Sequence, residues 1–80
     1  MDLDKMMQEL KRLNPYVEFC DLSNFKYNII IAKCDDCNKL KFPEGYSYSE
    51  RGELTRESKA SEEDDIFYLM TIEEYLIKQA

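Results

Sequence analysis

The run Ile29-Ile30-Ile31 limits the fold of this chain more than any other feature of its sequence. It lies in a stretch, Phe25 to Lys33, in which apolar and polar residues alternate with the period of a β-strand. Because neighbouring side chains of a strand point to opposite faces, three consecutive isoleucines call for apolar cover on both faces of a sheet. We therefore predict a central strand here, covered at least in part on each side.

A helix is predicted for the N-terminal segment, from Asp2 to Leu13. Its apolar residues recur at the spacing that lines one helical face: Leu3, Met6, Met7, Leu10 and Leu13. A carboxylate at Asp2 or Asp4 can accept hydrogen bonds from the free amides of the first turn. Asn14-Pro15 ends the helix, because proline disfavours helical geometry in the residue before it.

Two further strands are predicted beside the central one. The segment 16–20 is rich in aromatic and β-branched residues, and we expect it to form a hairpin with 25–33. The segment 39–42 is predicted to be a third strand, with Leu40 and Phe42 facing inward. Its two lysines suit an exposed sheet edge, where charge discourages pairing with other chains.

The segment 43–65 is predicted to be a long or mobile loop, because it is rich in serine and charge. A connection of that length in a small domain usually signals function or disorder. Tyr46 and Tyr48 alternate with serines, so a short edge strand at these residues is the alternative.

The C-terminal segment admits two interpretations. In the first, residues 65–70 form a buried strand, and Thr71 then caps a helix with Glu74 in a Thr-x-x-Glu capping box. In the second, a single helix runs from Ser61 to Gln79. We favour the first, because Ile-Phe-Tyr is a poor helix-forming run and the capping box lies where the pattern changes.

These elements predict an α+β fold in a single small domain, residues 1–80. It would consist of an N-terminal helix, an antiparallel sheet of three to four strands and a C-terminal helix. Eighty residues leave no room for a second core.

Three cysteines, an odd number, favour reduced thiols, and with no signal-peptide pattern at the N-terminus we expect a cytoplasmic protein. Cys34-x-x-Cys37 resembles one half of a zinc-ribbon knuckle. A structural zinc needs four ligands, the chain has no histidine, and Cys20 is expected about 30 Å from Cys34 at the strand rise. Zinc would need Asp35 or Asp36, or a second copy of the chain. We predict two unreactive thiols, with no metal and no cofactor.

The composition argues against catalysis. Without histidine there is no Ser-His or Cys-His pair, and with two glycines there is no glycine-rich phosphate loop. A helix followed by a strand meander resembles the opening of the PD-(D/E)XK nuclease core, but Lys39-Leu40-Lys41 lacks the acid that this site needs to hold a metal. We therefore expect no enzymatic activity.

The charge is distributed unevenly along the chain. Seventeen acidic residues against eleven basic ones give a net charge of −6, and residues 42–80 hold the whole excess. The negative electric field of such a charge excess repels nucleic acid and anionic membranes and attracts basic surfaces. Most of these acids, with two nearby tyrosines, make up the predicted partner-binding set: Glu50, Glu53, Glu57, Glu62, Glu63, Asp64, Asp65, Glu73, Glu74, Tyr46 and Tyr48.

In charge and size the chain resembles the small acidic inhibitors that phages make against host DNA-binding proteins. The resemblance implies a DNA mimic that occupies the basic nucleic-acid-binding surface of a partner protein, without touching nucleic acid or membrane itself. The alternative is an interaction or regulatory module without mimicry. It would bind through an apolar patch or a sheet edge, and one form of it is a homodimer joined by strand pairing or by shared zinc.

Overall fold

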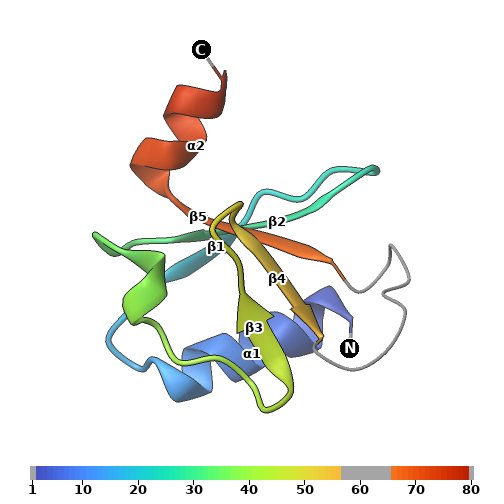
Figure 1. Ribbon diagram of the computed structural model, residues 1–80, viewed down its shortest axis with the longest axis vertical. Coiled ribbons are helices and arrows are strands. Elements are labelled where there is room, and N and C mark those ends of the chain that lie inside the picture. Colours follow the sequence, from blue (N-terminus) through green and yellow to red (C-terminus); the bar gives the residue numbers. More distant parts are fainter. Residues whose placement is uncertain (1, 57–65, 80) are drawn as a thin grey trace.

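The computed structural model describes residues 2–56 and 66–79. Figure 1 shows its elements, which follow in the order α1 (Leu3–Leu13), β1 (Phe19–Asp21), β2 (Asn28–Ala32), η1 (Cys37–Lys39), β3 (Tyr46–Tyr48), β4 (Glu53–Arg56), β5 (Phe67–Thr71) and α2 (Ile72–Gln79). The strands form one sheet in the order β1-β2-β5-β4-β3. The pair β2–β5 is parallel, and the pairs β1–β2, β4–β5 and β3–β4 are antiparallel.

The predicted α+β class is confirmed, and the sheet is mostly antiparallel, as predicted, but has more than the predicted three to four strands. The sheet has five strands and is mixed, because β5 pairs with β2 in the parallel direction. This pairing makes β2, β5 and β4 the inner strands, with β5 at the centre. The isoleucine run therefore lies in a strand with a neighbour on each side, as predicted.

Helix α1 covers one face of the sheet. The Asp2 carboxylate accepts a hydrogen bond from the backbone N–H of Lys5 at 2.8 Å and caps the helix start. Met6 and Leu10 are fully buried against the sheet. The core that they complete includes Phe19, Ile30, Ala32, Leu40, Leu54, Phe67 and Leu69. In Figure 1, α1 lies below the strands and α2 stands above them.

The predicted hairpin of the first two strands is confirmed. Cys20 pairs with Ile31 in an antiparallel register, although β1 begins only at Phe19 and Tyr16 is 99% exposed. The long loop 22–27 connects the strands, so Cys20 lies opposite the end of β2 that leads to Cys34. The expected separation of about 30 Å between these cysteines, which assumed that Cys20 adjoins a turn, is therefore wrong.

The predicted third strand at 39–42 is wrong. Cys37–Lys39 is a 3₁₀ helix, and the backbone of Lys41 is held by the side chain of Asn14 instead of by a strand. Leu40 is nevertheless buried and Phe42 packs against the core, so the inward direction of both side chains was correct.

The segment 43–56 is ordered as a hairpin, contrary to the predicted loop. Tyr46–Tyr48 is an edge strand, which confirms the alternative, and it pairs with Glu53–Arg56. The turn between them needs Gly52, whose φ of +82° is a conformation that other residues rarely adopt. The rest of the predicted loop, 57–65, lies outside the described residues.

The C-terminal segment forms a strand followed by a helix, as favoured from the sequence. The Thr71 hydroxyl accepts a hydrogen bond from the backbone N–H of Glu74 at 3.2 Å. In return, the Glu74 carboxylate accepts from the Thr71 backbone N–H at 3.2 Å. This reciprocal pair is the predicted capping box, and it turns the chain from β5 directly into α2.

Candidate functional site

The sheet has one face covered by α1 and an opposite face that is only partly covered. Ile30 and Leu69 point toward α1 and belong to the core. Their neighbours along β2 and β5 point the other way, so the register places Ile29 beside Tyr68 and Ile31 beside Met70. In the row Tyr27, Ile29, Tyr68 and Met70, the first residue is exposed, the next two are half-buried and Met70 is buried. We call this row the open face.

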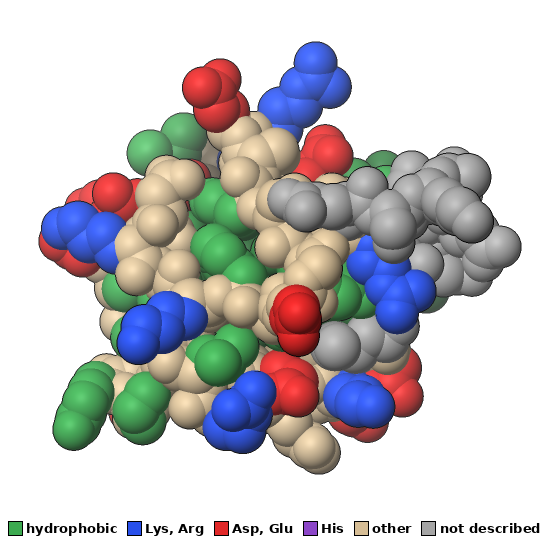
Figure 2. All heavy atoms as spheres, turned by 60° about the horizontal axis from the view of Figure 1, so that its bottom comes forward, with side chains coloured by type: hydrophobic (Ala, Val, Ile, Leu, Met, Phe, Trp, Pro, Cys, Tyr) green, Lys and Arg blue, Asp and Glu red, His purple; other side chains and the backbone are tan. Residues whose placement is uncertain are grey.

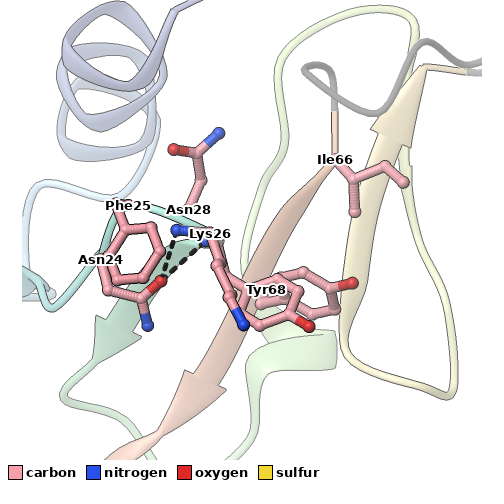
Figure 3. A pocket seen from close by; sticks show the side chains of 7 residues that line it. Asn24, Phe25, Lys26, Asn28, Ile66 and Tyr68 are labelled. Atoms are coloured by element: carbon pink, nitrogen blue, oxygen red, sulfur yellow. Dashed lines mark hydrogen bonds between the residues drawn. The ribbon is translucent and has the colours of Figure 1, made fainter.

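The open face is hollowed along its length. One hollow, of about 300 Å³, is lined by the four open-face residues together with Lys78 of α2. A second hollow, of about 460 Å³, continues toward the tip of the β1–β2 hairpin and is lined by Asn24, Phe25, Lys26, Tyr27, Asn28, Ile66 and Tyr68 (Figure 3). The two hollows share Tyr27 and Tyr68, so they adjoin at these rings, and we call the two hollows together the groove.

Two tyrosines form the middle of this groove. The rings of Tyr27 and Tyr68 meet edge to face, with centroids 5.5 Å apart and planes at 89°. This geometry is favourable for aromatic pairs and fixes both rings relative to the strands. Tyr27 remains 51% exposed, so the groove presents preordered aromatic surface to solvent.

The hairpin tip is held by a side-chain turn. The Asn24 side-chain carbonyl accepts hydrogen bonds from the backbone N–H groups of Lys26 and Tyr27, at 2.8 and 2.9 Å (Figure 3 draws the residues). Such local bonds are the reason that asparagine favours turns. The turn holds Phe25 at the tip with its side chain 96% exposed, and the Lys26 ammonium lies 5.9 Å from the centre of that ring.

Helix α2 leaves its three aliphatic residues exposed, whereas Tyr75 is half-buried. Lys78 lines the hollow over the open face, whereas Leu76 is 60% and Ile77 73% exposed. Ile72, at the start of the helix, is 46% exposed. An amphipathic helix of a water-soluble domain normally buries such residues. Figure 1 shows α2 projecting from the body of the molecule.

The Cys34-x-x-Cys37 motif lies at the other end of β2, in the turn that leads into η1. Cys37 is buried in the core, and Cys34 packs against it from a half-buried position. Burial raises the pKa of the Cys37 thiol to about 12, and the adjacent Cys34 adds to the rise. Among the described residues, no group of three or more cysteines and carboxylates is placed to hold a metal ion.

The raised pKa of Cys37 predicts a loss of stability at alkaline pH. A thiol with a higher pKa in the folded chain keeps its proton longer there, so its contribution is complete below the ordinary value of 9.0 and is lost as pH rises toward about 12. We expect the free energy of unfolding, measured with urea, to fall above pH 9.0. The fall should be smaller in Cys37→Ala and unchanged in Cys20→Ala. An equal fall in both variants would contradict this assignment.

The structure places only part of the predicted acidic set. Glu44 and Glu50 are exposed at opposite ends of β3, and Glu73 and Glu74 are exposed at the start of α2. Glu53 is half-buried on β4. The remaining acids of the second half lie outside the described residues: Glu57, Glu62, Glu63, Asp64 and Asp65. Residues 42–80 hold ten acidic residues, and that they form one negative partner-binding surface stays a prediction.

The two tyrosines assigned to the partner-binding set lie elsewhere than expected. Tyr46 is buried in the core, with its ring 6.4 Å from that of Phe67. Tyr48 is half-buried, stacks on Phe42, and donates its hydroxyl to the carbonyl of Leu69. Neither supplies the exposed ring that the acidic surface was expected to contain.

On the face shown in Figure 2, acidic and basic side chains are interspersed, with apolar patches between them. Among the described residues, ion pairs join Glu9 with Arg12 at 2.7 Å, Glu18 with Lys33 at 3.0 Å, and Asp35 with Lys39 at 3.6 Å. All six residues belong to the neutral first half of the chain. Ion pairs near the surface contribute little to stability.

No protein-family profile, no curated protein and no solved structure matches the chain. Within the described residues, no helix has both the length and the apolar character needed to cross a membrane.

Proposed function

We propose that this chain is a protein-binding module and that its binding surface is the open face together with the hairpin tip. The observation that carries the proposal is the groove of two adjoining hollows around Tyr27 and Tyr68, with an exposed Phe25 at one end. Removing apolar surface from water contributes roughly 25 cal/mol per Å². Covering the apolar part of this groove with another protein therefore lowers the free energy of the system.

The chemistry of the groove suits a protein surface. Tyrosine and phenylalanine are enriched at the centres of protein interfaces, because they bring large area at a low cost in conformational entropy. Asn24 and Asn28 add amide groups at the rim, where a partner's backbone can form hydrogen bonds. Preorganisation of the Tyr27–Tyr68 pair lowers the entropy lost when the partner docks.

A second candidate function is inhibition of a basic, nucleic-acid-binding protein by mimicry of DNA. The observation that favours it is the net charge of −6, carried by residues 42–80. Glu44, Glu50 and Glu73 are exposed and available for such a contact. The two candidates differ in salt dependence, since binding between opposite charges weakens as ionic strength rises, whereas apolar contact changes little.

Affinity capture with matched variants separates the candidates. Phe25→Ser with Tyr27→Ser alters two side chains that are at least half exposed, so the fold should persist. We expect this variant to lose the captured partner, while Tyr16→Ser, which alters an exposed ring elsewhere, retains it. Glu50→Lys with Glu73→Lys should also retain it. Loss of the partner in the glutamate variant alone, or on raising salt, would instead support the acidic inhibitor.

A further inference from the structure

We propose that the occupant of the open face is a second copy of this chain, with α2 of each copy lying across the open face of the other. The inference rests on the proposed function, since it names the partner for the same groove. It starts from two uncovered apolar features on one molecule: a projecting helix and a groove beside it.

The helix supplies the apolar ridge. Ile72, Leu76 and Ile77 are all substantially exposed, while the sheet side of α2 carries Lys78. Burial of apolar side chains normally drives a helix to pack against its own domain. Helix α2 leaves this apolar area exposed to solvent. An amphipathic helix laid in an apolar groove is a common mode of protein recognition.

The groove supplies the matching surface, and the charges are complementary. Among the described residues, both hollows are lined by lysines, Lys26 and Lys78, and by no acidic side chain. The exposed carboxylate of Glu73 lies on the same helix as the apolar ridge. Each copy would therefore bring an apolar ridge with a carboxylate beside it to a groove that is mostly apolar in the hollow next to α2 and polar and basic toward the hairpin tip.

A two-fold axis satisfies both features at once. In a symmetric dimer each contact occurs twice, so one docking event covers both helices and both grooves. A different protein would have to carry a groove for α2 and a ridge for the open face in the same relative placement. A second copy of this chain necessarily carries both the ridge and the groove. In each copy α2 lies next to the groove that α2 of the other copy would occupy.

Sedimentation equilibrium over a wide range of concentration tests this pairing. We expect a reversible dimer, and Leu76→Asp with Ile77→Asp should raise its dissociation constant at least roughly a hundredfold, because each changed side chain occurs twice at the interface. The control, Gln8→Asp with Tyr16→Asp, makes the same change in charge at exposed positions near α1 and should leave the constant unchanged. Circular dichroism verifies that every variant is folded.

Mixing two variants tests the geometry. Leu76→Asp with Ile77→Asp disables the ridge, and Tyr27→Asp disables the groove, so neither variant should dimerise alone. A mixture should form a heterodimer through the one intact ridge and groove. A wild-type monomer at all concentrations, or a dimer unaffected by the ridge variant, would overturn the proposal. The protein could also be a monomer that captures another protein through Phe25 and Tyr27. That result would overturn the proposal of a second copy as occupant, and the proposed function would still hold.

Discussion

Replacing Phe67 with alanine is expected to lower the free energy of unfolding by about 4 kcal/mol. Phe67 is fully buried at the start of β5, and its ring meets that of Tyr46 in the core. Alanine would remove the apolar contacts of the ring and leave a cavity that the sheet cannot close. A domain of this size has a total stability of about 4–12 kcal/mol, so the variant should be unfolded or close to it.

Thermal unfolding followed by circular dichroism measures this effect. A loss of about 4 kcal/mol should lower Tm by at least about 15 °C. The matched control is Phe25→Ala, in which the same side chain is removed from a 96% exposed position and the change in stability should stay within about 0.5 kcal/mol. Similar losses in the two variants would show that β5 is not the centre of the core.

Replacing Asn14 with alanine is expected to cost about 3 kcal/mol. The Asn14 side-chain amide donates hydrogen bonds to the carbonyls of Leu10 and Lys41, each at 2.9 Å, and its oxygen accepts from the Lys41 N–H at 2.8 Å. These bonds join the end of α1 to the irregular segment after η1. Without them, the Lys41 backbone groups would lose their partner in a partly buried place, which costs more than the bonds themselves contribute.

Urea unfolding compares this variant with two others. Asn38→Ala removes an exposed amide whose bond to Asp36 is local, and we expect a change within about 0.5 kcal/mol. Asn14→Asp keeps an acceptor for the Lys41 N–H but has no donor for its carbonyl, so its stability should fall between those of wild type and Asn14→Ala. A loss in Asn14→Ala no larger than that in Asn38→Ala would show that the link between α1 and Lys41 is unimportant.

The elements that sequence predicted well are those specified by neighbouring residues. Helix α1 has its cap, its apolar row and its proline stop within one continuous stretch, and it was placed to within a residue. The boundary between β5 and α2 depends on Thr71 and Glu74, which are three residues apart. Local signals of this kind need no knowledge of the remaining fold.

The elements that sequence missed depend on partners far along the chain. The alternation at 39–42 indicated correctly which side chains are buried. The backbone hydrogen bonds of Lys41, however, go to Asn14, 27 residues earlier. The parallel pairing of β2 with β5 likewise joins distant segments, and no local pattern specifies it. The hairpin of β3 and β4 was hidden because its polar composition resembles that of a loop.

The sequence predicted part of the open face. The alternation that places Tyr27 and Ile29 on the same side of β2 was apparent, and Tyr68 and Met70 alternate in the same way on β5. Which side α1 covers could not be read from either strand, so the uncovered side was not identified. The exposure of Leu76 and Ile77 could not be read from the sequence either, because the direction of these side chains depends on the capping turn at Thr71.

The claim on which the account depends is that another protein covers the groove around Tyr27 and Tyr68. Photocrosslinking in the cell tests it most directly, with a benzophenone-bearing amino acid placed at Tyr27 in one variant and at Tyr16 in another. Both positions are exposed, so general collision would label them alike. We expect a discrete crosslinked product at Tyr27, to a second copy or to a different protein, and none at Tyr16. No product at Tyr27, or the same products at both positions, would contradict the account.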